Sequence, residues 1–409
     1  MTLRQDADFI IKRAMAAAQP DEAVAAALRG RSFEGGKLLL VAIGKAGWQM
    51  ASAAVKSLSR PVDGVVITKY GHVRGELPGC RCFEAGHPVP DEGSFRATEE
   101  AIRLVGGLSA NDTVLFLISG GGSALFEKPL VTKEEMEDVT SQLLASGADI
   151  VEMNTIRKRL SAVKGGKFAK LCEPAKVFGI VLSDILGDPL DMIASGPAWP
   201  DSSTCEDAQR IAKKYNLRLS DRAAECLKVE TPKSLDNVEM MITGSVRQLC
   251  AAAEKAAQEL GYRPVFLTDC LDCEARAAGS FLGAIAKSMQ KSNESLAFIS
   301  GGETVVHLTG KGKGGRNQEL ALAAAEYLAS CHDSAVFSVG SDGTDGPTDA
   351  AGGFVDEMTK GKLTAKGLNA FDVLKDNDAY HALKAVDGLI VTGPTGTNVN
   401  DLSVLLVKR

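Results

Sequence analysis

Several polar motifs in this sequence follow short apolar runs that predict buried strands. In the first, LLLVAIGKAG, a strand over residues 38–43 leads through Gly44 to Lys45, and a helix is predicted to start near Trp48. A lysine beside the partly positive end of a helix is unfavourable unless an anion binds there. The alternative is an ordinary surface lysine at a helix start. The motif favours a lysine that binds an anion.

The run FLISGGGSAL predicts a second anion site, because its glycines stand between a strand and a helix. Consecutive backbone N–H groups in such a turn form a nest for phosphate or carboxylate oxygens. Three adjacent glycines cost backbone entropy, so a purely structural turn explains them poorly, although helix–strand packing could require one of them. A shorter echo, AFISGGET, has a glutamate in place of a glycine. The candidate phosphate- and nucleotide-binding residues are Gly44, Ser119, Gly120, Gly121, Gly122, Ser123, Gly301, Gly302 and Glu303.

The basic segment MNTIRKRLSAVKGGK is a candidate binding site for an acidic substrate. Asn154, Arg157 and Ser161 share one helix face by their spacing of three and four residues. Basic helical residues are more usually a solvated face, and both interpretations stay open. The candidate substrate-binding residues are Asn154, Arg157 and Lys158.

A glycine-rich loop, LTGKGKGGRNQE, matches the dinucleotide-binding pattern GxGxxG literally, and Arg316 follows its last glycine. That pattern expects an acidic residue at the end of the next strand about 20 residues on, but the first acid after that strand is Asp342. The loop also carries more positive charge than binding a pyrophosphate requires. Phosphoryl transfer does require such charge, because several negative oxygens must be neutralised as the phosphoryl group moves.

Two acidic loops offer carboxylates after predicted strands. GSDGTDGPTDAAGG carries Asp342 and Asp345, whose oxygens suit Mg²⁺, although Asp followed by Gly is also ordinary turn chemistry. LSDILGDP places Asp184 directly after a strand, where a proton acceptor or a metal-binding carboxylate is expected. The sequence lacks the GxxxxGK[ST] phosphate loop, the protein-kinase motifs, GxSxG and HExxH, so common nucleotide and hydrolase folds do not explain it.

These motifs need a scaffold, and the alternation of short apolar runs with Ala-rich helical stretches predicts an α/β protein with a mostly parallel sheet. Open α/β sheets bind ligands at the carboxyl edge, where each motif lies. The polar stretch Val229 to Asn237 is the candidate linker, giving domains 1–235 and 236–409. The predicted strands are Leu38 to Ile43, Val65 to Thr68, Thr113 to Ile118, Val177 to Leu182, Val238 to Thr243, Pro264 to Thr268, Leu296 to Ile299, Ala335 to Val339, Gly388 to Val391 and Ser403 to Val407.

Composition narrows the classes of function. The 409 residues carry a net charge of −6, which leaves no basic field for nucleic acid. Nine cysteines without paired CxxC spacing indicate reduced thiols rather than disulfides or zinc. The N-terminus reads as an amphipathic helix and no run is long enough for a membrane span, so we expect a cytoplasmic protein.

The motifs together resemble the glycerate 2-kinases of the two-domain, MOFRL-containing type. Ten motifs follow the family's order over nearly the whole chain. They are KYGH at Lys69 to His72, AGHPVPDEGS at Ala85 to Ser94, ISGGGSAL, NTIRKRLSAVKGG, LSDILGDP, SGPAWPDSST, SGGET, GGRNQE, GSDGTDGPTDAAGG and GPTGTNVNDL. The resemblance implies a Rossmann-like N-terminal domain, a smaller C-terminal α/β domain and an active site in the cleft between them. It also implies ATP-dependent transfer to the 2-hydroxyl of D-glycerate, with Mg²⁺ or Mn²⁺. The family's essential lysine and arginine match Lys45 and Arg316. Arg159 departs from the family, which commonly has a histidine there.

From this resemblance we expect the triphosphate on the Gly120–Ser123 loop and Lys45, with Arg316 neutralising the transferring group. Asp342 or Asp345 would hold the ion, Asp184 would orient or deprotonate the attacking hydroxyl, and Asn154 with Arg157 would meet the substrate carboxylate. Two alternatives stay open: an NAD(P)H-dependent hydroxypyruvate reductase, suggested by GxGxxG, and a non-catalytic sensor of nucleotides or sugar acids. The expected state is a monomer or homodimer.

Overall fold

The computed structural model describes residues 1–409 and divides them into two compact units. The first unit is Ala23–Thr243, and the second combines Met1–Glu22 with Gly244–Arg409. The predicted domain boundary at residue 235 differs from this division of the structure in two segments. The N-terminal helix belongs to the second unit, and Val229–Asn237, the candidate linker, lies inside the first, where the buried hydroxyl of Thr231 donates to Asp201.

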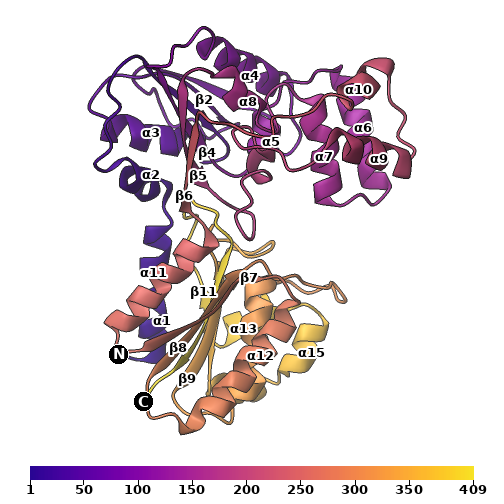
Figure 1. The fold of residues 1–409 in the computed structure, drawn as a ribbon. Helices are drawn as coiled ribbons and strands as arrows, with labels where there is room; N and C mark the ends of the chain where they lie inside the picture. The colour runs from indigo at the N-terminus through magenta and orange to yellow at the C-terminus, as the bar shows by residue number, and fades with distance from the viewer. The chain divides into compact units, whose positions relative to one another are not determined.

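The first unit is built on a six-stranded sheet with the order β3-β2-β1-β4-β5-β6, in which β1 to β5 are parallel (Figure 1). Its strands are β1 (Leu38–Ile43), β2 (Asp63–Lys69), β3 (Cys80–Ala85), β4 (Thr113–Ile118), β5 (Lys176–Leu182) and β6 (Val238–Gly244). Its helices are α2 (Pro20–Leu28), α3 (Gly47–Ser57), α4 (Glu92–Leu104), α5 (Gly122–Leu125), α6 (Lys133–Ala145), α7 (Ile150–Leu160), α8 (Lys167–Leu171), α9 (Cys205–Lys214) and α10 (Asp221–Cys226), with a 3-10 turn at Ile193–Ser195.

Helices cover both faces of this sheet, which explains why its central strands are continuous apolar runs. Along β1, Leu39, Val41 and Ile43 pack into one buried cluster together with residues of α4 and α8. Leu38, Leu40 and Ala42 point to the other face and pack with residues of α2 and α3. Helices α6, α7, α9 and α10 form a separate helical lobe around their own apolar cluster, to one side of the sheet in Figure 1.

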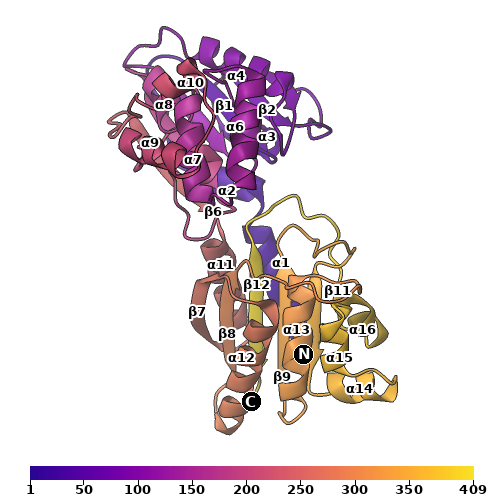
Figure 2. The ribbon, with the colours of Figure 1, turned by 90° about the vertical axis from the view of Figure 1, so that its right-hand side faces the viewer.

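The second unit contains another six-stranded sheet, with the order β11-β10-β9-β12-β8-β7. Only β7 and β8 pair in parallel; β12 lies antiparallel between β8 and β9. Helices α12 and α13 lie side by side on one face of the sheet (Figure 2). The elements are α1 (Leu3–Ala17), α11 (Val246–Glu259), β7 (Arg263–Leu271), α12 (Ala275–Ser288), β8 (Leu296–Gly302), α13 (Arg316–Leu328), β9 (Ser334–Gly340), β10 (Gly352–Asp356), α14 (Thr359–Ala365), α15 (Ala370–Lys375), α16 (Ala379–Ala385), β11 (Leu389–Ile390) and β12 (Asp401–Val407), with a 3-10 turn at Met289–Lys291.

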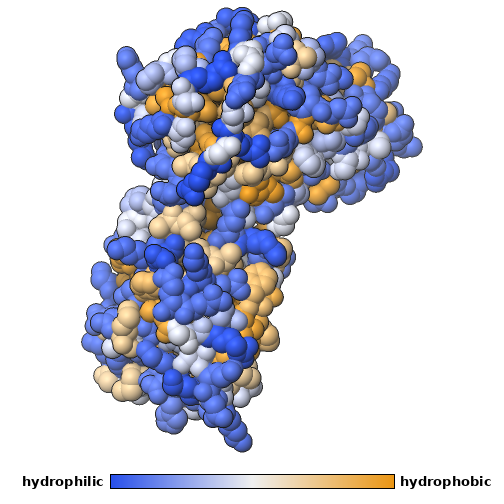
Figure 3. All heavy atoms as spheres, turned by 60° about the vertical axis from the view of Figure 1, so that its left-hand side comes forward, coloured by the Kyte–Doolittle hydropathy of each residue, from blue (hydrophilic) through white to orange (hydrophobic).

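The α/β fold class predicted from the sequence is confirmed for both units. The mostly parallel sheet is a property of the first unit only, since the second sheet is mainly antiparallel. Hydrophilic residues cover most of the face drawn in Figure 3. None of the helices combines the length and the apolar run that crossing a membrane requires.

A completely buried charged pair lies near the end of α5 in the first unit. Lys164 and Glu127 form an ion pair in which neither side chain is exposed to solvent. Burial lowers the pKa of Lys164 to about 8, although the charge of Glu127 opposes that shift. The Lys164 ammonium also lies 3.4 Å from the Phe126 carbonyl oxygen, directly after α5.

We expect Lys164→Met to lower the free energy of unfolding by about 3–5 kcal/mol, because it leaves the Glu127 carboxylate buried and unpaired. Urea unfolding of the full chain measures the change. Lys170→Met is the matched control, since its pair with Glu173 is largely exposed and should contribute at most about 1 kcal/mol. An equal decrease in the free energy of unfolding of the two variants would show that the buried pair stabilises the fold no more than an exposed pair does.

Candidate functional site

The predicted motifs of the first unit meet at the carboxyl edge of its sheet, because β1, β4 and β5 are parallel neighbours. The Lys45 N–H donates to the Gly120 carbonyl at 2.8 Å. The Ser119 hydroxyl donates to the Ile43 carbonyl at 3.1 Å and accepts from the Ala46 N–H at 3.1 Å. The structure therefore brings Gly44, Lys45 and the glycine loop together, as the sequence predicts.

The loop from Gly120 to Ser123 leaves its backbone donors in front of a short helix. Gly121 has a φ of 84°. The hydrogen bonds within the turn begin at Ala124, whose N–H donates to the Gly121 carbonyl. A Cβ on Gly120 would lie 2.0 Å from Asp184 Oδ2, so the carboxylate packs directly against this glycine. Both features suit a ligand at the loop, with Asp184 beside it.

Lys45 and His87 flank Gly121. A Cβ on Gly121 would lie 3.0 Å from His87 Nε2 and 3.2 Å from Lys45 Cγ. Burial lowers the pKa of His87, and the charges of Lys45 and Lys69 lower it further, which favours the neutral imidazole. The Lys45 ammonium forms no ion pair within the protein, which leaves it available to an anion. His87 therefore lies beside the glycine loop.

Helix α7 brings Asn154 and Arg157 to the same loop. Arg157 Nη2 donates to the Ser123 carbonyl at 3.2 Å. Asn154 Oδ1 accepts from the hydroxyl of Ser195, which also lies 3.0 Å from the hydroxyl of Ser123. Sequence analysis did not single out Ser195, because its place depends on the backbone of the following turn.

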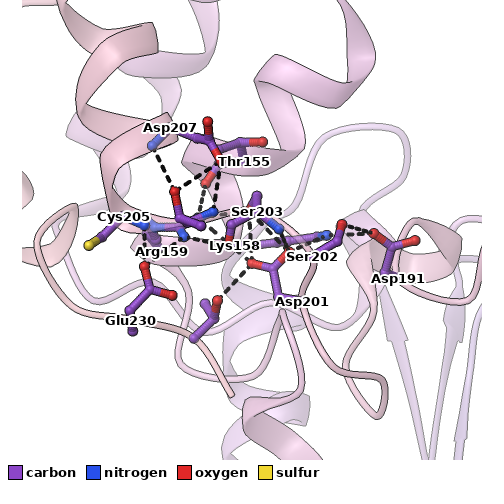
Figure 4. Close-up of polar contacts among 12 residues, drawn as sticks. Thr155, Lys158, Arg159, Asp191, Asp201, Ser202, Ser203, Cys205, Asp207 and Glu230 are labelled. Carbon is purple, nitrogen blue, oxygen red and sulfur yellow. Dashed lines mark hydrogen bonds and ion pairs between the residues drawn. The ribbon is translucent and has the colours of Figure 1, made fainter. Parts of the chain in front are cut away.

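Lys158 points away from this group, into the buried network of Figure 4. Its side chain is 2% exposed, and its ammonium lies 2.9 Å from Asp201 and 3.6 Å from Asp191. Burial raises the pKa of Asp201, but the charge and hydrogen bond of Lys158 outweigh it, so the net pKa lies below its ordinary value. Arg159 is also fully buried and bonds the Ser203 hydroxyl and carbonyl. These contacts tie α7 to the segment before α9.

In the second unit Arg316 is the first residue of α13 and is held by two acids. Its Nε and Nη2 bond the two oxygens of Asp401 at 2.6 and 3.1 Å, and its Nη1 bonds Glu303 at 2.7 Å. Burial lowers the pKa of Arg316, but the hydrogen bond and charge of Asp401 outweigh this, so the net pKa is raised. The side chain stays about a third exposed (32%), so it can still meet a ligand. Asp401 is a site residue that sequence analysis missed, although an aspartate opening an apolar run is a visible signal.

The other glycine motifs of the second unit have structural explanations. Gly301 and Gly302 pair with Leu402 and Asp401 as part of the sheet. In the GxGxxG loop, Gly310 N–H donates to Asn377, Lys311 N–H to Asp376 and Lys313 N–H to Asp378. A Cβ on Gly310 would lie 2.3 Å from the backbone of Asp376. These backbone donors are already used, so the loop does not offer the pyrophosphate cradle of the dinucleotide fingerprint.

The two candidate metal ligands differ in their surroundings. Asp345 is 3% exposed, and its carboxylate accepts from the N–H groups and side-chain amides of Asn317 and Gln318. Burial raises its pKa to about 6 while those N–H donors oppose the shift. Asp345 thus caps the start of α13. The Asp342 carboxylate accepts from the Thr344 N–H at 2.9 Å, and the residue is partly exposed.

A different trio of possible metal-binding side chains lies elsewhere, at Cys205, Glu206 and Glu230. Glu230 already pairs with Lys233 at 2.7 Å, and two of the three residues are exposed. The burial and charge of this trio do not distinguish it from an ordinary acidic surface, so we assign no metal to it.

A parallel sheet with a free lysine, a glycine loop and a carboxylate at its carboxyl edge defines the class of α/β enzymes that act on anionic ligands. Two family models match the chain: "Domain of unknown function (DUF4147)" over residues 6–228 and "MOFRL family" over residues 296–401. The chain belongs to the MOFRL-containing glycerate 2-kinase family, and the resemblance seen in its motifs is confirmed.

Three relatives cover nearly the full length. A protein named D-glycerate 2-kinase from Thermotoga maritima is 50% identical and covers 99% of each chain. A glycerate 2-kinase from Pyrococcus horikoshii is 40% identical, covering 100% of this chain and 98% of its own. A putative hydroxypyruvate reductase from Agrobacterium vitis is 39% identical, covering 100% and 95%. The crystal structure of the Thermotoga maritima glycerate kinase superimposes with a TM-score of 0.95 over 99% of each chain, at 50% identity.

The contact between Gly120 and Asp184 gives a direct test of the site. Gly120→Ala would push the carboxylate or the loop out of place, and we expect kcat/KM for phosphoryl transfer to fall about 100-fold. Steady-state kinetics of the purified chain measure it. Gly361→Ala is the control, because its Cβ would meet nothing within 4 Å, and it should keep full activity. Full activity of the Gly120→Ala variant would refute the assignment of Asp184 and this loop to the site.

Proposed function

We propose that the protein is a glycerate 2-kinase that transfers the γ-phosphoryl group of ATP to the 2-hydroxyl of D-glycerate, giving 2-phosphoglycerate and ADP. The full-length relatives named glycerate 2-kinase support this reaction. The observation that carries it is the unpaired Lys45 beside the N–H groups of the glycine loop, with Asp184 against the same loop. A phosphate needs both charge and backbone donors, and the strand edge supplies them.

We assign the roles in the first unit from these contacts. Gly120–Ser123 and Lys45 bind phosphate oxygens, and Asp184 orients or deprotonates the attacking hydroxyl. Arg157, which is partly exposed, meets the substrate carboxylate, and Asn154 supports that end of the site. Lys158 is left out of the substrate contacts, because its charge is neutralised in the interior by Asp201.

In the second unit Arg316 is the proposed cation that stabilises charge on the transferring group, and both Lys45 and Arg316 are needed for turnover. The pair of bonds from Asp401 fixes the plane of the guanidinium, while Glu303 bonds a third nitrogen. We propose Glu303 as a residue next to the bound nucleotide and leave out Gly301 and Gly302, whose backbone belongs to the sheet.

A divalent ion, Mg²⁺ or Mn²⁺, fits only part of the predicted acidic loop. Asp342 has carboxylate oxygens free for an ion and would hold it, whereas Asp345 already accepts four N–H donors. When bound, the ion would neutralise phosphate charge. We also propose a cytoplasmic setting, which nine free cysteines fit, and a monomer or homodimer as the active state.

The rival activity, NAD(P)H-dependent hydroxypyruvate reduction, has one observation in its favour: the printed name of the Agrobacterium vitis relative. Its sequence argument was the GxGxxG loop. The N–H groups of that loop bond Asp376, Asn377 and Asp378 instead of facing a ligand. The kinase is therefore the better-supported function.

The test incubates the full chain with D-glycerate, ATP and Mg²⁺, and in parallel with hydroxypyruvate and NADH. We expect ADP and 2-phosphoglycerate to form and NADH to persist. Lys45→Ala should lower kcat by at least about 1,000-fold, because the lost cation stabilised charge in the transition state. Lys56→Ala, an exposed lysine of α3, is the control that should keep full turnover. Oxidation of NADH without ADP formation would reverse the assignment.

A further inference from the structure

A chain of three polar side chains links the glycine loop to α7. Ser195 Oγ lies 3.0 Å from Asn154 Oδ1 and 3.0 Å from Ser123 Oγ. Ser195 is fully buried and Asn154 is 5% exposed, so water does not compete for the bond between them, whereas Ser123 is partly buried. The Ser123 hydroxyl thus has a buried hydrogen-bond partner within the protein.

The direction of each bond follows from the donors available. An amide oxygen can only accept, so Ser195 donates its single hydroxyl proton to Asn154. The Asn154 Nδ2 faces the sulfur of Met192 at 3.9 Å, a weak acceptor that suits this amide orientation. Ser195 Oγ then accepts from Ser123, whose own proton is used within the protein. Ser123 Oγ consequently presents only lone pairs to a ligand at the loop.

The backbone around Ser195 is held in an unusual conformation that keeps this arrangement in place. Ala194, Ser195 and Gly196 have φ of 51°, 61° and 63°. Left-handed backbone is uncommon and costly for residues other than glycine, and such positions cluster at functional sites. The carbonyls of Ser195 and Gly196 accept from the N–H groups of Gly165 and Gly166 at 3.0 and 2.7 Å, which secures the turn.

Lone pairs without a proton restrict what Ser123 can bind. Phosphate and carboxylate oxygens are acceptors too, so neither can bond this oxygen, whereas a hydroxyl can donate to it. A metal ion would also accept lone pairs. Arg157, however, donates to the carbonyl of Ser123 at 3.2 Å, and its positive charge disfavours a second cation there. The same guanidinium suits a carboxylate.

We propose that Ser123 Oγ accepts a hydrogen bond from a hydroxyl of the acceptor hydroxy acid, and that Ser195 is the residue that positions Ser123 for this contact. The proposal rests on the proposed kinase function. It divides the glycine loop between two ligands: the backbone N–H groups of its glycines bind phosphate, and the Ser123 side chain recognises the acid. A hydroxyl on Ser123 with a carboxylate on Arg157 defines a hydroxy acid as the ligand.

The test compares KM for the two substrates. Ser195→Ala and Ser195→Gly free the Ser123 proton, and we expect KM for D-glycerate to rise about tenfold while KM for ATP changes less than about twofold. The glycine variant fits the positive φ, so the loss of the hydroxyl is separated from any backbone strain. Ser202→Ala is the matched control, since this exposed hydroxyl bonds only Asp191 and should leave both KM values unchanged.

A double-mutant cycle separates positioning from a structural role. Ser123→Ala should raise KM for D-glycerate about tenfold, and Ser123→Ala with Ser195→Gly should raise it by much less than a further tenfold, because the effect that Ser195 exerts through Ser123 is already lost. Additive effects would refute the positioning role. A rise in KM for ATP, or in the Mg²⁺ concentration needed for half-maximal rate, would refute the hydroxyl contact. If the unaltered chain forms no ADP with D-glycerate, the kinase function itself fails, which is a distinct result.

Discussion

The site of the first unit depends on the close approach of two neighbouring strand ends. A Cβ on Gly44 would lie 2.3 Å from the Ser119 carbonyl oxygen, so only glycine allows the chain after β1 to meet the chain after β4. The Ser119 hydroxyl and the Lys45 N–H then join the two loops by hydrogen bonds. This contact sets Lys45 and the glycine loop side by side, and because both faces of the sheet are buried, the edge is the place left for a ligand.

Charged groups at this edge and in the interior serve different purposes. Lys158 and Lys164 are buried and neutralised by Asp201 and Glu127, and they fasten α7 and the end of α5 to the rest of the unit. Lys45 has no such partner. The buried pairs hold the supporting helix in place while one ammonium remains for substrate, as preorganised electrostatic stabilisation requires. Arg316 of the second unit combines both properties: two acids orient its guanidinium, and part of its side chain stays exposed.

The sequence predicted the central strands and the meeting of their loops well, and the surroundings less well. β1 and β4 are continuous apolar runs, and their predicted ends are those of the structure. β3 and β10 were missed, because CRCFEA contains charges and GGFVD begins with two glycines. The antiparallel place of β12 between β8 and β9 could not be predicted, since strands buried on both faces show no alternation. Among the site residues, sequence cannot tell a metal-binding aspartate from a helix cap such as Asp345, nor find Ser195, whose role comes from backbone conformation.

We propose that the strand edge of the first unit holds both the phosphate and the acid. A crystal structure of the full chain soaked with D-glycerate and a non-hydrolysable ATP analogue tests it most directly. We expect phosphate oxygens on the N–H groups of Gly120–Ser123 beside Lys45, with a glycerate hydroxyl on Ser123 Oγ and its carboxylate at Arg157. Glycerate bound away from this loop, or a phosphate oxygen on Ser123 Oγ, would contradict it.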